Sequence, residues 1–230
     1  MCNINRGGMV FILLDLELFL KENAATFGVM LDDANVCDLA AFKEFLLEYN
    51  KNVNLTAITE DREFAVKHFL DSLTILPYIE KKSPRVIDVG TGAGFPGVVA
   101  KIARPDLEIT LLDARAKKVK FLQQVVELLK LTNVDCIHGR AEEIVKTAGF
   151  AAGFDYATSR AVGPIKNLAA WCLPFIKPGG LFIAMKGPNF ADELDEARPL
   201  IKKNKCKIVD IKNITLVDEI ERNLILIEKI

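Results

Sequence analysis

The sequence predicts an α/β protein with a mostly parallel, doubly wound sheet of about seven strands, and three observations support this fold class. Short apolar runs alternate with helical segments from residue 84 onward, at the spacing of β-α-β units. A glycine-rich loop directly follows the first of these runs. The last two runs are separated by only a few residues, so they are expected to pair as a C-terminal antiparallel hairpin.

The segment before the sheet carries the periodicity of helices. Apolar residues such as Leu39 and Phe42 recur at intervals of three and four, and Asp38 is a suitable N-cap for the helix that contains them. A loop-like stretch follows over residues 50–56. A second helical segment is expected over residues 64–79, so helices precede the sheet.

Five runs are expected to form parallel strands, because each is apolar over nearly its whole length, as in strands covered on both faces. They are RVIDV (85–89), EITLLD (108–113), VDCIHG (134–139), FDYATS (154–159) and LFIAMKG (181–187). Residues 206–217 and 222–228 are expected to form the hairpin. The chain is thus predicted to have an N-terminal helical extension over residues 1–80, beginning with a loose terminus at residues 1–8, and a sheet domain over residues 81–230.

The composition excludes several classes of protein. Half of the 230 residues are apolar and the formal net charge is −1, so no overall basic charge announces a polyanionic partner. No CxxC pair occurs among the five cysteines and the chain has only two histidines, which argues against a zinc site and for a reducing compartment. The apolar run near the start is too short to span a membrane. We expect a cytoplasmic protein with no bound metal and no membrane association.

The glycine-rich loop predicts a cofactor site. Gly92, Gly94 and Gly97 have the GxGxxG spacing, and Asp113 follows at the end of the next strand, so the dinucleotide-binding fingerprint is formally satisfied. A helix is expected to begin near Pro96, because proline suits a first helical turn. A nicotinamide dinucleotide is therefore one possible ligand.

Two features favour S-adenosylmethionine over a nicotinamide cofactor. Asp88 lies on a strand that dinucleotide-binding domains usually keep apolar, and a carboxylate there needs a cationic or hydrogen-bonding partner. The amino group or sulfonium of S-adenosylmethionine would supply that partner, directly or through water. The chain also offers no second domain for a hydride acceptor. Asp113 can accept both ribose hydroxyls, which serves either cofactor.

Several motifs in order resemble the class I methyltransferases and, more narrowly, the RsmG (GidB) family of small-subunit ribosomal RNA methyltransferases. They are VIDVGTGAGFPG, LLDARAKKVKFL, FDYATSRAV and the Met185-Lys186-Gly187 strand end, with NKNVNLTAI and His68-Phe69-Leu70-Asp71-Ser72 upstream. The resemblance runs from about residue 40 to the C-terminus. It implies a Rossmann-like methyltransferase domain, S-adenosyl-L-methionine as cofactor, and 16S ribosomal RNA or the small ribosomal subunit as partner. Ala93 and Phe95 depart from the proline and leucine that relatives often carry.

Position by position, the resemblance implies cofactor contacts from three loops that follow strands. These contacts are Gly90 and Phe95 in the first loop, Ala141 and Glu142 after the third strand, and Arg160 after the fourth. The backbone of Ala141 and the carboxylate of Glu142 would read the adenine edge. Arg160 would bind the cofactor carboxylate or a substrate phosphate through its planar fork. Together with Asp88, Gly92, Gly94 and Asp113, these residues form the predicted cofactor site.

The segment after the fourth strand narrows the reaction. It reads Thr158-Ser159-Arg160-Ala161, not the NPPY-like motif common in enzymes that methylate exocyclic amines. No cysteine lies in a loop after a strand, where carbon-5 methylation of cytosine would need a nucleophile. Guanine N7 attacks a methyl group without first losing a proton, so it needs no general base. We therefore assign no catalytic residue. The family resemblance, with which this absence agrees, implies methyl transfer to guanine N7 of 16S ribosomal RNA, by alignment of the reacting atoms.

Other functions remain open at this stage. The near-neutral charge favours a small-molecule methyltransferase, and the GxGxxG spacing favours an NAD-binding Rossmann protein. A non-catalytic RNA-binding domain with the same fold is a third alternative. His68, Asp71 and Ser72 share a helical face, but without a GxSxG elbow we expect them to cap or pack. The basic run over residues 115–120 is a candidate for phosphate contact, and the chain is expected to be a monomer.

Overall fold

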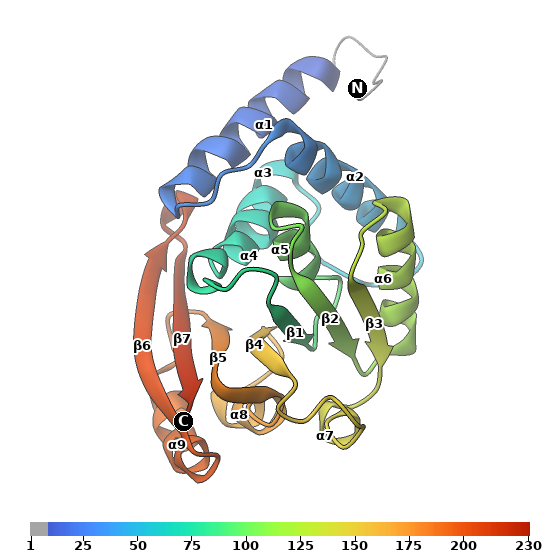
Figure 1. Cartoon of the computed structure of the whole chain (residues 1–230). Helices are drawn as coiled ribbons and strands as arrows, with labels where there is room; N and C mark the ends of the chain where they lie inside the picture. The colour runs from blue at the N-terminus through green and yellow to red at the C-terminus, as the bar shows by residue number, and fades with distance from the viewer. Residues whose placement is uncertain (1–8) are drawn as a thin grey trace.

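The computed structural model describes residues 9–230, and a seven-stranded sheet runs through this part of the chain (Figure 1). The strands are β1 (Arg85–Val89), β2 (Glu108–Asp113), β3 (Val134–His138), β4 (Phe154–Arg160), β5 (Ile176–Lys186), β6 (Cys206–Thr215) and β7 (Glu221–Lys229). Their order across the sheet is β3-β2-β1-β4-β5-β7-β6. Strands β1 to β5 run parallel, and β7 is antiparallel to both of its neighbours. The predicted fold class is confirmed.

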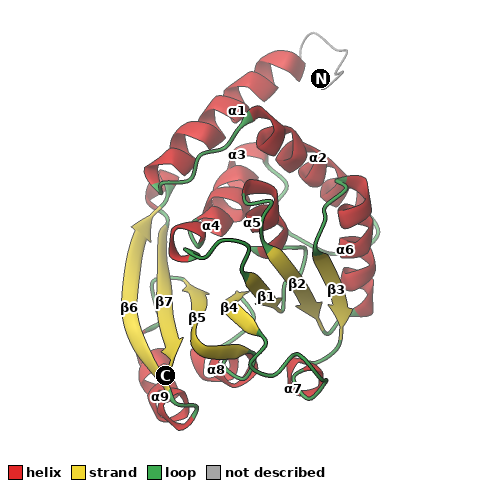
Figure 2. Ribbon diagram, viewed as in Figure 1, coloured by secondary structure: helices red, strands yellow, loops and turns green. Residues whose placement is uncertain are grey.

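Helices cover both faces of this sheet, as Figure 2 shows. They are α1 (Met9–Thr26), α2 (Asp33–Asn50), α3 (Asp61–Phe64), α4 (Asp71–Leu73), α5 (Gly97–Ala103), α6 (Ala116–Leu128), α7 (Ala141–Ile144), α8 (Ile165–Cys172) and α9 (Ala191–Lys203). A π-helical turn, Ala65–Leu70, joins α3 to α4 without a break. Short 3-10 turns lie at Leu76–Tyr78 and Val217–Glu219.

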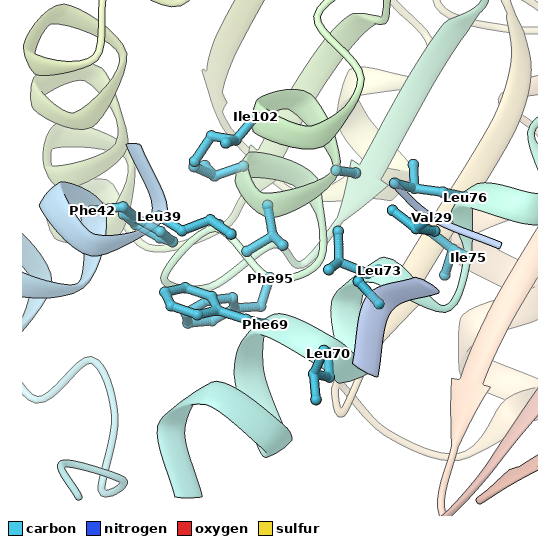
Figure 3. Close-up of a cluster of buried hydrophobic side chains, with 14 of the residues drawn as sticks. Val29, Leu39, Phe42, Phe69, Leu70, Leu73, Ile75, Leu76, Phe95 and Ile102 are labelled. Carbon is cyan, nitrogen blue, oxygen red and sulfur yellow. The ribbon is translucent and has the colours of Figure 1, made fainter. Parts of the chain in front are cut away.

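Two apolar cores lie on opposite faces of the sheet, because successive side chains of a strand point to opposite sides. Val86 belongs to the core beneath the N-terminal helices, α5 and α6, whereas Ile87 belongs to the core beneath α8 and α9. Figure 3 shows part of the first core, where Phe42 of α2 and Phe69 of the π-helical turn lie near Phe95 of the glycine loop. The helices before residue 80 and the sheet therefore share one core, and the division of the chain at residue 80 stays a prediction.

The start of α2 corrects one sequence prediction. The N-cap is Asp32 and not Asp38, which lies inside the helix. The Asp32 carboxylate accepts from the Asn35 amide at 2.7 Å, and the Asn35 side chain accepts from the Asp32 amide at 3.1 Å. This reciprocal pair satisfies two amide donors at the helix start, and Asp38 has no equivalent partner because the helix has already begun.

Strand β5 begins earlier than predicted. It starts at Ile176 and not near Leu181, because Pro178, Gly179 and Gly180 resemble a turn in the sequence. In the structure the strand continues through this segment, and the register against β4 shifts between Phe154 and Tyr156 to accommodate it. The other strand predictions hold to within one or two residues, and the β6–β7 hairpin is confirmed.

Two further expectations meet the structure only in part. The loose terminus predicted for residues 1–8 lies outside the described residues. Among residues 9–230, no helix combines the length and the apolar character that crossing a bilayer requires.

Candidate active site

The candidate site lies at the carboxyl ends of the parallel strands, where β1 is flanked by β2 and β4. This is the point at which the strand order reverses, and open α/β sheets bind their ligands there. Three neighbouring cavities occupy this edge, with volumes of about 380, 240 and 390 Å³. We name them the central cavity, the α7–α8 cavity and the β5 cavity.

The three cavities form a continuous series because each shares residues with the next. The central and α7–α8 cavities share Gly90, Asp113, Ala114 and Val162. The central and β5 cavities share His68, Arg160 and Ala161. A ligand with several parts could therefore extend across the edge of the sheet.

The glycine loop forms the floor of the central cavity. The amides of Gly90 and Thr91 both donate to the Leu112 carbonyl, at 2.8 and 3.1 Å, which ties the loop to β2. Gly90 has a φ of +74°, and a Cβ there would lie 2.6 Å from a Val162 methyl group. The position therefore requires glycine on both backbone and packing grounds.

Asp88 lies beneath this loop and is completely buried. Its Oδ2 accepts from the Gly97 amide at 2.9 Å, at the start of α5, whereas Oδ1 and the neighbouring Thr91 Oγ1 make no well-formed hydrogen bond. Burial raises the pKa of Asp88 to about 6, and the Thr91 hydroxyl and the Gly97 amide oppose that rise. Asp88 lines none of the three cavities, so its predicted part in cofactor binding would act through the loop and stays a prediction.

Asp113 lies at the junction of the central and α7–α8 cavities. Its Oδ2 accepts from the Gly92 amide at 3.0 Å, and its Oδ1 accepts from the Arg115 amide at 2.8 Å. The Lys118 ammonium lies 3.9 Å from Oδ2. Each carboxylate oxygen keeps acceptor capacity for a ligand hydroxyl, because one amide uses only one of its lone pairs.

The α7–α8 cavity contains Ala141 and Glu142, as the sequence predicted. It also contains Trp171 of α8, whose indole Nε1 donates to Glu142 Oε1 at 2.5 Å. Sequence reasoning missed this tryptophan, because nothing in the pattern of α8 distinguishes it from a residue that only packs.

A stacked group of side chains lies between the central and β5 cavities. The His68 ring stacks on the Phe95 ring, and the Arg160 guanidinium carbon lies 5.0 Å from the Phe95 ring centroid. Arg160 Nη1 donates to the Lys67 carbonyl at 2.8 Å, and its Nη2 lies 3.2 Å from His68 Nδ1. Since a guanidinium can only donate, Nδ1 must be the acceptor, and the imidazole proton lies on Nε2, which is 2.8 Å from Thr56 Oγ1.

His68 is held in its neutral form. Burial lowers the pKa of its imidazole to about 3, and the positive charge of Arg160 acts in the same direction. A neutral imidazole matches the hydrogen bonds that it makes, one accepted and one donated. With so low a pKa, the imidazole stays almost entirely unprotonated at neutral pH and is a weak base.

Asp71 connects two arginines at the wall of the β5 cavity. Its carboxylate accepts from Arg160 Nη1 at 2.9 Å and from Arg222 Nε at 3.1 Å, and the residue is 2% exposed. Lys67 and Lys186 also line this cavity. Lys67 is paired with Glu63 and Lys186 with Glu193, each at 2.6 Å, but both ammonium groups and both guanidinium groups have further N–H donors, so the β5 cavity suits an acceptor-rich ligand.

His68, Asp71 and Ser72, which were expected only to cap or pack, differ in what they contact. Ser72 does pack, since its hydroxyl donates to the His68 carbonyl at 2.5 Å in a buried position. His68 and Asp71 are also buried, His68 against Phe95 and Asp71 between two arginines, but in addition both line the β5 cavity. In the basic run over residues 115–120, Arg115 and Lys118 line the central cavity.

Neither Cys136 nor Cys172 resembles a nucleophile. Burial raises the pKa of the Cys136 thiol in β3 to about 11 and that of Cys172 in α8 well above its usual value. Neither lines any of the three cavities. Across the part of the chain that the structure describes, no group of three or more histidine, cysteine or acidic side chains could hold a metal ion.

All but two of the predicted site residues line the central cavity or the α7–α8 cavity. Lining at least one of them are Gly90, Gly92, Phe95, Asp113, Ala141, Glu142 and Arg160. Asp88 and Gly94 line neither. Gly94 has a φ of +98° and serves the loop, since its amide donates to the Thr91 carbonyl at 2.9 Å.

Solved structures of other proteins share this fold. A precorrin-6y C5,15-methyltransferase from Geobacter metallireducens GS-15 has a TM-score of 0.54 and 13% identity, with 75% of this chain and 90% of that chain covered. A SAM dependent methyltransferase from Aquifex aeolicus has a TM-score of 0.52 and 17% identity, with 70% and 90% covered. At these identities the likeness concerns the fold.

Sequence comparison is more specific. The family model described as GidB, rRNA small subunit methyltransferase G, matches residues 35–225. The ribosomal RNA small subunit methyltransferase G of Alkaliphilus oremlandii (strain OhILAs) is 43% identical over 220 residues, covering 94% of this chain and 92% of the relative. Because both matches span nearly the whole chain, the protein belongs to the rRNA small subunit methyltransferase G (GidB) family.

Proposed function

We propose that the protein transfers the methyl group of S-adenosylmethionine to N7 of a guanine in 16S ribosomal RNA, in the cytoplasm. The observation that carries the proposal is the series of three cavities, in which two suit the cofactor and the third, rich in cationic side chains, suits a nucleotide. Family membership supports ribosomal RNA as the substrate.

The residues of the central and α7–α8 cavities fit S-adenosylmethionine. Asp113 lies where the two cavities join and can accept the ribose hydroxyls, and Glu142 offers a carboxylate to the adenine amino group. Gly90 leaves room that a Cβ would fill, beside Val162. When bound, the cofactor would supply an electrophilic methyl group on a sulfonium, and Phe95 lines the central cavity beside it.

The β5 cavity fits a single flipped-out guanosine of RNA. Lys67, Lys186 and Arg222 present donors to phosphate oxygens or to O6 of the base, which leaves the N7 lone pair free. Lys67 is paired with Glu63 and Lys186 with Glu193, each at 2.6 Å, so these side chains offer a ligand their remaining N–H donors more than a large net positive charge. RNA binding is therefore expected to weaken as salt is raised.

The chemistry requires alignment more than proton transfer. The N7 lone pair of guanine is available for in-line attack, so no residue must remove a proton first. His68, with its pKa near 3, is suited to holding Phe95 and Arg160 in place and poorly suited to acting as a base. We further propose that the protein acts as a monomer, with residues 1–80 forming a helical extension packed on the 81–230 methyltransferase domain.

The test is methyl transfer in vitro with labelled S-adenosylmethionine. The substrates are 16S ribosomal RNA and small subunits from a strain that lacks this modification, and the product is mapped by mass spectrometry of nuclease fragments. We expect one 7-methylguanosine. Labelling of a metabolite in place of either RNA substrate would favour the small-molecule alternative. Tight NAD binding without response to S-adenosylhomocysteine would overturn the cofactor assignment.

A further inference from the structure

Trp171 is tied to the one acidic side chain of the α7–α8 cavity besides Asp113. Its Nε1 donates to Glu142 Oε1 at 2.5 Å, and both residues line the cavity. The indole is half-buried and packs against the core beneath α8 and α9, alongside Ile144 and Val145. The ring is therefore held by packing, and its N–H has a defined direction.

This hydrogen bond restricts a side chain that would otherwise be free. Glu142 is exposed on the short helix α7, where a carboxylate samples several rotamers. The indole N–H occupies one of its oxygens and fixes the plane of the carboxylate. The second oxygen, Oε2, has no side-chain or backbone donor among the described contacts of Glu142 and stays available as an acceptor at the cavity.

We propose that Trp171 is a positioning residue that makes the cofactor site select a 6-amino purine. It orients Glu142 so that Oε2 accepts from the 6-amino group of the cofactor's adenine. A carboxylate can only accept, so it pairs with the amino group of adenine and opposes the 6-oxo group of hypoxanthine, which is also an acceptor. This inference rests on the proposed function, because it assigns the α7–α8 cavity to adenine.

Replacing the carboxylate by an amide gives the sharpest consequence. In Glu142→Gln, the Trp171 N–H still requires an acceptor, so it holds the amide oxygen, because an indole can donate and not accept. The amide NH₂ must then face the cavity as a donor. The preference should reverse toward a 6-oxo purine. If Trp171 is also changed to phenylalanine, the amide can rotate freely and this reversal should disappear.

The experiment measures, by calorimetry, the affinities of S-adenosylhomocysteine and S-inosylhomocysteine for five proteins. The proteins are the unaltered chain, Trp171→Phe, Glu142→Gln, the double variant and the control Glu143→Gln, which changes a neighbouring exposed carboxylate in the same way. We expect the unaltered chain and the control to prefer the adenosyl ligand about tenfold. Trp171→Phe should lower that ratio to about threefold, Glu142→Gln should invert it, and the double variant should show no preference.

The outcomes separate the inference from the function on which it rests. An adenosyl preference that is unchanged in Trp171→Phe overturns the positioning role while leaving the cofactor assignment intact. A double variant that stays inverted does the same, because the amide would then be oriented by something other than Trp171. Binding of neither ligand to the unaltered chain overturns the proposed function and this inference together. As a second signal, the emission of Trp171, the single tryptophan of the chain, should change on binding S-adenosylhomocysteine.

Discussion

The imidazole ring of His68 lies nearly parallel to the phenyl ring of Phe95, with 10° between the ring planes and 4.3 Å between their centroids. One ring belongs to the π-helical turn before the sheet and the other to the glycine loop after β1. The contact joins the N-terminal helices to the glycine loop. Arg160, which donates to His68 and lies over Phe95, adds the end of β4 to the same group.

The depressed pKa of His68 predicts a pH-dependent loss of stability. In the folded chain the pKa of His68 is about 3, against 6.5 in the unfolded chain. Above pH 6.5 the ring is neutral in both states, and the free energy of unfolding has its full value. The free energy of unfolding decreases as the pH falls from 6.5 toward 3, because in this range only the unfolded chain takes up a proton on His68. Relative to His68→Gln, the unaltered chain should lose about 2 kcal/mol in free energy of unfolding between pH 7 and pH 5. Urea titrations at pH 7, 6 and 5 measure this, and a pH-independent difference would contradict it.

The raised pKa of Asp88 predicts the opposite dependence of stability on pH. Its folded pKa of about 6 lies above the ordinary 3.8, so the buried charge destabilises the folded chain at neutral pH, and stability rises as the pH falls from 6 toward 3.8. Asp88→Asn keeps an acceptor for the Gly97 amide and can donate to the Thr91 hydroxyl. At pH 8 it should raise the free energy of unfolding by up to about 3 kcal/mol, with the gain vanishing near pH 4.

Asp88→Ala is the informative companion to this variant. It removes the charge and also the acceptor of the Gly97 amide. We expect it to weaken S-adenosylhomocysteine binding by about tenfold through the loop, whereas Asp88→Asn should leave the affinity within about threefold. Calorimetry on both variants decides the matter, and an equal loss in both would point to a direct role of the charge.

The packing of Gly90 against Val162 predicts a partial rescue. Gly90→Ala should lower the free energy of unfolding by about 1 to 2 kcal/mol from the left-handed backbone alone, with a further cost from the 2.6 Å contact. Val162→Ala removes the contact and leaves the backbone cost. The double variant should therefore melt above Gly90→Ala and below Val162→Ala. If Gly90→Ala and the double variant melt at the same temperature, the contact with Val162 contributes nothing to the cost of Gly90→Ala.

The contacts of Arg160 predict that lysine cannot replace it. Its guanidinium binds the Lys67 carbonyl and Asp71 and lies over Phe95, and an ammonium cannot meet all of these at once. Arg160→Lys should lower kcat/KM for methyl transfer by at least about thirtyfold, equivalent to about 2 kcal/mol. Arg198→Lys, at an exposed pair with Asp195, is the matched control. Activity of Arg160→Lys near that of the control would contradict the prediction.

The sheet was predictable because its signals are local. β1 and β2 have the predicted bounds, since each is an apolar run ended by a loop or a polar segment, and Gly90 marks the turn after β1. Two errors came from ambiguous local chemistry. Asp32 and Asp38 are equally good caps until Asn35 is seen to complete the pair, and Pro178 and Gly179 indicate a turn although β4 offers them a strand partner.

Most of the wall of the β5 cavity could not be predicted, because its members come together only through tertiary contacts. Asp71 and Arg222 are separated by most of the chain and meet because β7 inserts between β5 and β6. Trp171 and Glu142 meet because α7 and α8 lie side by side. Site residues in the loops after strands could be predicted from the sequence, whereas site residues on helices, such as Trp171 and Asp71, could not.

In the π-helical turn Ala65–Leu70, the number of residues matters for the geometry of the candidate active site. One wide turn brings the Lys67 carbonyl, the His68 ring and, just after it, the Asp71 carboxylate to the same guanidinium. Deleting one residue here would replace the wide turn by a regular α-helical turn, and these three groups would no longer be spaced to meet one guanidinium. Although helices usually tolerate substitution, this one should reject any insertion or deletion. Homologues should therefore keep its residue count constant even where its side chains vary.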